Sequence, residues 1–223
     1  LASSRPDRYV AISKTVQERI RKYYHLKSEV IYPPVEVKRL QIYDLRFKNK
    51  DKYFLVVSRL VPYKRVDLVV KVFNDLGWNL KIVGVGNQLM NLKKIARSNI
   101  EFLGQVKEEE LVYFYQNCQA LIMACEEDFG IVALEAQAAG KPVIAFGRGG
   151  ALETVIERKT GLFFREQTEK DLKLALLQFN QLKFKPSACQ KQAARFSEEI
   201  FIKKFKNFVE EQWLKFKTTN RLK

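Results

Sequence analysis

The chain has few of the residues that build disulfide frameworks or metal clusters. Its 223 residues include three cysteines and one histidine, His25. The cysteines are Cys118, Cys125 and Cys189, and no two of them have C-x-x-C spacing. This composition argues against both a disulfide framework and a Cys/His metal site, and it predicts unpaired thiols in a reducing compartment.

Long apolar stretches are also missing. No run approaches the roughly 20 apolar residues that a membrane-spanning helix needs, and residues 1–5 contain no apolar signal core. No G-x-G-x-x-G opens a helix after the first predicted strand, which disfavours an NAD-dependent Rossmann enzyme. We therefore expect a cytoplasmic protein that could associate peripherally with the inner face of a membrane.

Acidic residues are scarce relative to basic ones, and the formal net charge is +15. The basic excess lies in residues 1–52 and 158–223, whereas residues 53–157 are close to neutral. Basic flanks fit an anionic membrane surface, nucleic acid, the acidic face of a missing domain, or a solvated surface without a specific partner. Nucleic acid is disfavoured because the chain contains no recognisable DNA- or RNA-binding motif.

Short β-branched runs alternate with amphipathic segments through the middle of the chain. The predicted strands are residues 53–57, 80–83, 100–103, 120–123, 143–146 and 161–164. The predicted helices between them are residues 66–76, 88–97, 108–116 and 131–139. Such alternation predicts right-handed βαβ crossovers and an α/β fold with a Rossmann-like, doubly wound parallel sheet.

The segments on either side of this region have other patterns. Ser13 is predicted to cap a helix, and the proline pair at residues 33–34 marks residues 30–35 as an interdomain connection outside the core. From residue 168 onward the pattern is helical. We therefore divide the chain into residues 1–34, the end of a first domain and the connection; residues 35–182, a nucleotide-sugar-binding Rossmann-like domain; and residues 183–223, C-terminal helices.

Two carboxylates lie eight residues apart around the start of a predicted helix. Glu127 precedes Gly130 in the loop, and Glu135 lies one to two turns inside the helix. One acid can therefore face a ligand at the helix N-terminus while the other reaches it from the side of the helix. The unpaired backbone N–H groups after Gly130 suit a phosphate.

Further motifs fall in loops that follow predicted strands, where ligands bind in open parallel sheets. The segments are Ser58-Arg59-Leu60-Val61-Pro62-Tyr63-Lys64-Arg65, Val83-Gly84-Val85-Gly86 and Gly149-Gly150-Ala151-Leu152-Glu153. Together with the paired acids, their order and spacing resemble the family-4 retaining glycosyltransferases, or glycosyl transferases group 1. The resemblance covers about residues 9–213 and corresponds to the C-terminal, donor-binding half of a GT-B enzyme.

The resemblance implies roles for particular residues. Arg59 and Lys64 would bind the diphosphate of the donor and stabilise the leaving group, and Glu127 would contact the donor sugar. Glu135 would bind the ribose hydroxyls. The remaining implied donor-binding residues are Gly84, Gly86, Phe129, Gly130, Ile131, Gly149 and Gly150. His25 does not match the family's catalytic histidine, which belongs to the first domain.

The implied activity is transfer of a hexose from a GDP- or UDP-linked donor to a polysaccharide or lipid-linked acceptor, with retention and without a metal or other cofactor. Mannose is favoured weakly, because the segment 146–153 looks like bacterial mannosyltransferases. The alternative is a non-catalytic nucleotide-sugar-binding or membrane-docking subunit of a split enzyme. A metal held by the acidic cluster at residues 126–128 is a minor third possibility. The chain alone would need a separate acceptor-binding domain for activity.

Some features leave alternatives open. Ser58 and Arg65 stand where the family usually has glycine, and Arg148 adds a cation of unassigned role. The C-terminal aromatics Phe201, Phe205, Phe208 and Trp213 resemble the final GT-B helix that braces the first domain. Periodicity alone equally permits them to pack on the sheet of this domain.

Overall fold

The computed structural model describes residues 5–41 and 52–220. Residues 42–51, which belong to the predicted second domain, lie outside the described residues, as do residues 1–4 and 221–223. Within the described ranges, no helix is both long and apolar enough to cross a membrane.

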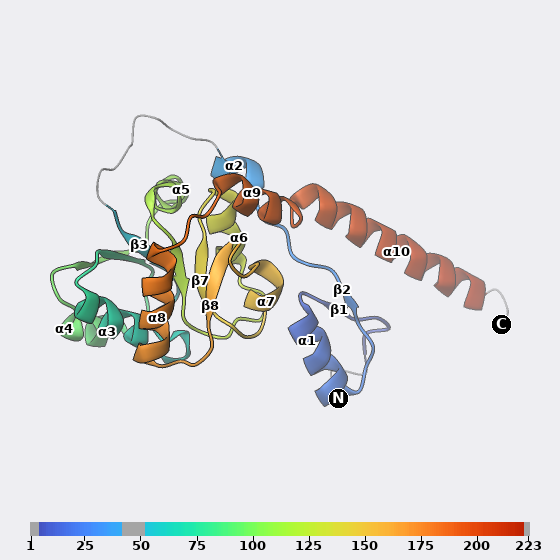
Figure 1. Cartoon of the computed structure of the whole chain (residues 1–223). Coiled ribbons are helices and arrows are strands. Elements are labelled where there is room, and N and C mark those ends of the chain that lie inside the picture. Colours follow the sequence, from blue (N-terminus) through green and yellow to red (C-terminus); the bar gives the residue numbers. More distant parts are fainter. Residues whose placement is uncertain (1–4, 42–51, 221–223) are drawn as a thin grey trace.

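A six-stranded parallel sheet forms the centre of the protein (Figure 1). Its strands are β3 (Phe54–Val57), β4 (Leu80–Val83), β5 (Ile100–Gly104), β6 (Leu121–Met123), β7 (Val143–Phe146) and β8 (Gly161–Phe164). Their spatial order is β5-β4-β3-β6-β7-β8, so the order of connection reverses between β3 and β6. The predicted doubly wound parallel sheet is confirmed, and folds of this topology bind ligands beyond the carboxyl ends of the strands.

Helices cover both faces of the sheet. Those between the strands are α3 (Val66–Leu76), α4 (Leu89–Ile95), α5 (Glu108–Asn117), α6 (Ile131–Ala138) and α7 (Ala151–Thr154), and α8 (Glu169–Asn180) follows β8. Side chains of α3, α4 and α8 share one buried cluster with alternate strand residues such as Phe54 and Val56. Leu55 faces the other cluster, with α5 and α6. This alternation is the two-residue period of a strand buried on both sides.

A small N-terminal unit precedes the sheet. It contains β1 (Val10–Ala11), α1 (Lys14–Arg19), a π-helical turn η2 (Ile20–Tyr24) and β2 (Glu29–Val30), and β1 pairs with β2 in parallel. The Ser13 side chain accepts a hydrogen bond from the backbone N–H of Val16, which confirms the predicted cap.

The connection that follows is more buried than its prolines indicated. Ile31 and Val35 are 2% and 3% exposed, and the Val35 backbone N–H donates to the carbonyl of Phe196. The prediction that residues 30–35 lie outside the core was therefore wrong at these two positions. At Val35 the physical reason is that the chain passes from the proline pair directly into the cluster formed with α2 (Val37–Gln41) and α6.

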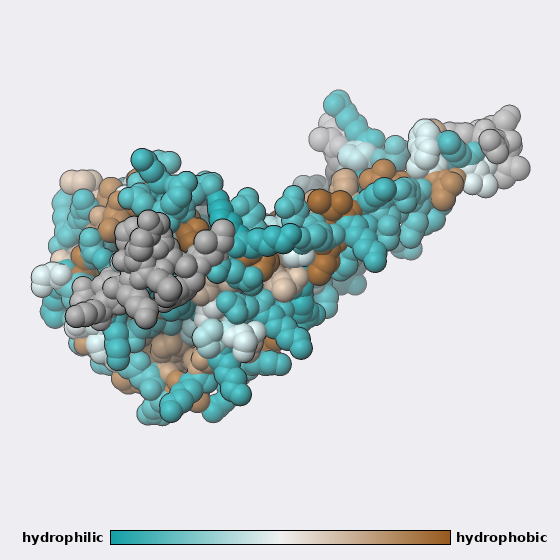
Figure 2. Space-filling view, turned by 90° about the horizontal axis from the view of Figure 1, so that it is seen from above, coloured by the Kyte–Doolittle hydropathy of each residue, from teal (hydrophilic) through white to brown (hydrophobic). Residues whose placement is uncertain are grey.

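The chain ends in two helices, α9 (Pro186–Ala194) and α10 (Glu198–Asn220). Helix α9 packs against α6, whereas α10 leaves the domain as a long arm (Figure 1). Figure 2 shows hydrophobic residues along this arm. Phe205 and Trp213 are 43% and 54% exposed, so the alternative in which these aromatics pack on the sheet of this domain is wrong. The boundaries predicted after residues 34 and 182 remain predictions.

Candidate donor site at the carboxyl edge of the sheet

The predicted site residues follow four strands that lie side by side. Arg59 comes after β3, Gly84 directly follows β4, Glu127 follows β6 and Gly149 follows β7. In a parallel sheet the carboxyl ends of these strands share one edge. The fold therefore gathers the motifs at one edge of the sheet, as their order along the sequence predicted.

The two glycines after β4 are required by the neighbouring loop. A Cβ atom on Gly84 would lie 1.9 Å from the carbonyl oxygen of Ser58, and one on Gly86 would lie 2.2 Å from the carbonyl oxygen of Leu60. Two backbone hydrogen bonds at Leu60, one from its own N–H to Val85 and one from Gln88, join the same loops. These glycines thus let the β3 and β4 loops pack backbone to backbone. Their predicted contact with the donor remains a prediction.

Lys64 and Glu127 form an ion pair at this edge of the sheet. The Nζ atom of Lys64, in the 3-10 turn η4 (Pro62–Lys64), forms an ion pair and hydrogen bond with Oε1 of Glu127. The two side chains are only 13% and 20% exposed, and the thiol of Cys125 lies 3.2 Å from the same oxygen. Burial by itself lowers the pKa of Lys64, but the hydrogen bond and charge of Glu127 outweigh it and raise that pKa above its usual value. Lys64 is therefore a fixed cation at this edge.

Arg59 has different surroundings from Lys64. Its guanidinium donates a hydrogen bond of 2.9 Å to the hydroxyl of Tyr63, and it forms no ion pair with any carboxylate of the described residues. Its side chain is exposed and its charge is available to an anion. The two cations thus differ: one is held by an acid, and the other is oriented by a neutral hydroxyl.

Arg65 is one of the two positions that depart from the family pattern. It has φ 52° and ψ 35°, in the left-handed region, between η4 and α3. That region favours glycine, which the resembling family usually carries here. The Arg65 side chain pairs with Asp67 at 3.4 Å, so arginine in place of glycine adds a cation at the cost of backbone strain.

Glu135 points to a tyrosine. Its carboxylate accepts a hydrogen bond of 2.6 Å from the hydroxyl of Tyr115 on α5. Burial is the largest influence on Glu135 and raises the pKa of this carboxyl, despite the opposing hydrogen bond from Tyr115. Tyr115 is fully buried, and sequence reasoning did not single it out because its position looks like an ordinary helix interior. Glu135 is thus a half-buried acid on α6 that is oriented by Tyr115 of α5.

The loop between β6 and α6 is fixed on one side by aromatic packing. Gly130 has φ 82° at the start of α6, which confirms the predicted helix start, and Ile131 behind it is 40% exposed. Phe129 is 4% exposed and stacks on Tyr32 with ring centroids 5.7 Å apart. The Phe129 side chain therefore belongs to the core, and only its backbone can reach a ligand.

The glycine pair after β7 binds the same loop from its other side. The backbone N–H of Gly150 donates to the carbonyl of Glu127 at 2.7 Å, and Gly149 forms a parallel bridge with Glu127. A Cβ atom on Gly149 would lie 2.4 Å from the carbonyl oxygen of Glu127, and a Cβ atom on Gly150 would lie 2.3 Å from the Cα of Phe129. Arg148, between β7 and these glycines, lies over the ring of Phe146.

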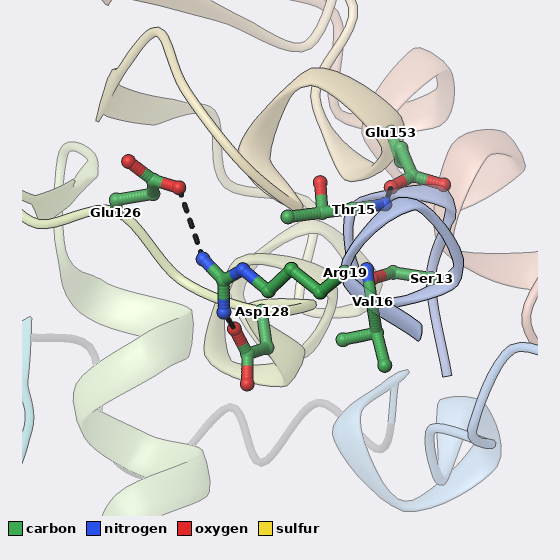
Figure 3. A network of polar contacts seen from close by, with 7 residues as sticks. All are labelled: Ser13, Thr15, Val16, Arg19, Glu126, Asp128 and Glu153. Atoms are coloured by element: carbon green, nitrogen blue, oxygen red, sulfur yellow. Dashed lines mark hydrogen bonds and ion pairs between the residues drawn. The ribbon is translucent and has the colours of Figure 1, made fainter. Parts of the chain in front are cut away.

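The acidic cluster at residues 126–128 is occupied by cations. Lys64 pairs with Glu127, and Arg19 of α1 pairs with both Glu126 and Asp128 (Figure 3). No three His, Cys, Asp or Glu side chains in the described part of the chain are grouped so that they could hold a metal ion. The acidic cluster is therefore explained by ion pairs, and metal-independence remains a prediction. Arg19 was missed because nothing in its local sequence indicates a contact more than 100 residues away.

The parallel sheet, the reversal of strand order and the long final helix define the C-terminal half of a GT-B architecture. The chain belongs to the glycosyl transferases group 1 family, whose model matches residues 37–197. The family predicted from the four motifs is thereby confirmed.

Individual known proteins resemble the chain over part of their length. An uncharacterized glycosyltransferase of Methanocaldococcus jannaschii is 30% identical over 79% of this chain and 50% of its own length. A GDP-mannose-dependent alpha-(1-6)-phosphatidylinositol monomannoside mannosyltransferase of Mycobacterium tuberculosis is 40% identical over 48% of this chain and 32% of its own. The chain thus spans half or less of these relatives.

Among solved structures, Anabaena HepE in complex with UDP and glucose superposes with a TM-score of 0.80 at 16% identity, covering 94% of this chain and 65% of that one. At this identity the likeness shows the fold.

Proposed function

We propose that the chain is the donor-binding half of a retaining glycosyltransferase, which transfers a hexose from a nucleoside diphosphate sugar to a polysaccharide or lipid-linked acceptor. The ion pair between Lys64 and Glu127 is the observation that carries this proposal. It joins a cation of the first loop to an acid 63 residues away, at the edge of the sheet where such folds bind ligands. Family membership supports the same reaction class.

The diphosphate of the donor would lie between Arg59, Lys64 and the first backbone N–H groups of α6. A guanidinium, an ammonium and a helix N-terminus are all suited to phosphate oxygens. When the diphosphate arrives, it competes with Glu127 for the ammonium of Lys64. Glu127 is then released to accept hydrogen bonds from the hydroxyls of the donor sugar.

Glu135 would bind the ribose. Tyr115 already donates to one of its carboxylate oxygens at 2.6 Å, which leaves the remaining lone pairs for a ribose hydroxyl. A half-buried carboxylate with a fixed donor on one side discriminates between ligands that supply a further hydrogen bond and those that do not.

The chemical step would rely on leaving-group stabilisation. As the glycosidic bond breaks, negative charge grows on the departing diphosphate, and Arg59 and Lys64 are oriented to stabilise it. The departing phosphate oxygen would take the proton of the acceptor hydroxyl while that hydroxyl attacks the sugar from the same face. The configuration is then retained without a protein nucleophile. The acceptor would be supplied by a first domain.

Two known proteins favour different nucleotides. The mycobacterial relative is named GDP-mannose-dependent, and the HepE structure contains UDP. We propose GDP-mannose as the donor, because the mycobacterial sequence is the more similar of the two. The exposed face of α10 would contact the first domain, and the alternative partner for the basic flanks is an anionic membrane surface.

Titration calorimetry tests this function. The chain is titrated with GDP, UDP, GDP-mannose and UDP-glucose, together with Lys64→Ala and the matched control Lys93→Ala on the exposed side of α4. We expect guanine nucleotides to bind in the micromolar to millimolar range and Lys64→Ala alone to weaken them. Absence of binding by all four ligands at millimolar concentration refutes the proposal. Binding without any transfer, even with a matching acceptor domain present, favours the non-catalytic alternative.

A further inference from the structure

Helix α1 lies against the loop that carries Glu127 (Figure 3). The guanidinium of Arg19 donates through one terminal nitrogen to Oε1 of Glu126 at 3.1 Å and through the other to Oδ1 of Asp128. These two acids stand directly before and after Glu127 in the sequence. One side chain from the N-terminal unit therefore holds the donor loop on both sides of its central acid.

A second contact fixes the start of the same helix. The Glu153 carboxylate accepts hydrogen bonds from the backbone N–H groups of Lys14, at 3.0 Å, and Thr15, at 3.3 Å. It also accepts one of 2.8 Å from the hydroxyl of Tyr32. A carboxylate at a helix N-terminus is favoured both by hydrogen bonding and by the helix dipole. Helix α1 is thus held at its beginning by α7 and at its end by the donor loop.

Three consecutive carboxylates would repel one another and an incoming diphosphate. Lys64 pairs with the middle acid, and Arg19 pairs with the outer two. Each carboxylate therefore has a cation, and the loop can keep one conformation beside the start of α6. Without Arg19, two uncompensated negative charges would remain next to the place where the donor diphosphate binds.

We propose that Arg19 is a positioning residue of the donor site, which holds the Glu126–Asp128 loop in the conformation that receives the diphosphate. This inference rests on the proposed function. Arg19 acts through Glu126 and Asp128 and contacts no reacting atom. Because coupling between two sites is reciprocal, a nucleotide bound beside the loop must in turn stabilise α1.

The experiment compares Arg19→Ala and Arg19→Lys with the control Arg21→Ala. Arg21 is exposed two residues further on and, within the described residues, pairs with no carboxylate of the donor loop. GDP and UDP are titrated into each protein. We expect Arg19→Ala to bind the preferred nucleotide about three- to tenfold more weakly, the size of effect typical of partly exposed charge networks. Arg19→Lys should recover part of the loss, and Arg21→Ala should bind normally.

Two further measurements separate positioning from a general structural effect. Adding Glu126→Gln and Asp128→Asn to Arg19→Ala removes the charges that Arg19 compensates, and should restore most of the affinity. Hydrogen exchange on the unmodified chain should show slower exchange in α1 when nucleotide is added. The exchange measurement needs no variant, so it tests the coupling between α1 and bound nucleotide even where Arg19→Ala fails to fold.

The outcomes are distinguishable from failure of the proposed function. If the unmodified chain binds neither GDP nor UDP at millimolar concentration, the donor-site assignment itself falls and takes this inference with it. If the unmodified chain binds nucleotide, but Arg19→Ala matches Arg21→Ala within twofold and nucleotide leaves exchange in α1 unchanged, the role of Arg19 is refuted and the proposed function stands.

Discussion

Replacing Lys64 should weaken nucleotide binding, whereas replacing Glu127 should not. Lys64→Met removes the ammonium but keeps most of the aliphatic volume. A hydrogen bond to a charged group contributes about 1.5–3 kcal/mol, which corresponds to an affinity loss of about 10- to 150-fold for GDP or UDP. Glu127→Gln removes the competitor for the ammonium of Lys64. It should therefore leave the affinity for free nucleoside diphosphate unchanged or raise it severalfold, while transfer activity is lost.

The same variants should differ in stability. The side chains of Lys64 and Glu127 are 13% and 20% exposed, so this ion pair lies between an exposed and a fully buried salt bridge. Loss of Lys64 should lower the free energy of unfolding by about 1–3 kcal/mol, because the acid loses its partner. The double variant should lose less than the sum of the single variants.

Calorimetry and urea denaturation of all four proteins check this reasoning, with Lys93→Ala as a surface control. If Glu127→Gln weakens nucleotide binding as strongly as Lys64→Met, the acid does not compete for the ammonium and the proposed exchange of partners is refuted.

The remaining predictions concern pH and backbone. The pKa of Lys64 is raised in the folded protein, so the stabilisation by its ammonium is full below the unfolded pKa of about 10.4 and disappears as the pH rises through the folded pKa. Urea denaturation above pH 10 should therefore show a smaller difference in the free energy of unfolding between wild type and Lys64→Met. Tyr115→Phe should lower the free energy of unfolding by about 1–2 kcal/mol at pH 7, because Glu135 loses its hydrogen-bond donor. Because burial raises the pKa of Glu135, this loss should become smaller as the pH falls toward 4 and the carboxylate is protonated, in the same denaturation assay. Arg65→Gly should stabilise the protein by about 0.5–1 kcal/mol by relieving the left-handed backbone, seen as a higher melting temperature; a lower one contradicts the strain. Gly150→Ala should destabilise by more than about 2 kcal/mol, since its Cβ would overlap the loop backbone, and an unchanged melting temperature would contradict that clash.

Local patterns predicted the fold well. Helix α3 and strands β4, β7 and β8 begin and end where periodicity and flanking glycines placed them, because their apolar side chains have no alternative burial. The differences elsewhere are small: α4 stops at Ile95, since Ala96 adopts an extended backbone. The larger error was at Val35, where a proline pair indicated a linker but the tertiary packing on α6 and α9 buries the next apolar residue.

The site was predictable in location and unpredictable in its contacts. The rule that ligands bind beyond the carboxyl ends of parallel strands sufficed to bring the motifs to one edge. Which acid pairs with which cation depends on side-chain directions set by the whole fold. Nothing local distinguishes Tyr115, the partner of Glu135, from other helical aromatics, and the contact of Arg19 with Asp128 spans 109 residues.

The bridge between Glu127 and Gly149 limits how this part of the candidate site can vary. Neither Gly149 nor Gly150 can accept a side chain, and a Cβ on Gly147 would already touch Phe163 at 3.3 Å. Arg148 alone in this turn is exposed. We expect paralogues that handle a different sugar to vary at position 148 while retaining the three glycines around it, so that selectivity evolves through one side chain on an otherwise invariant backbone.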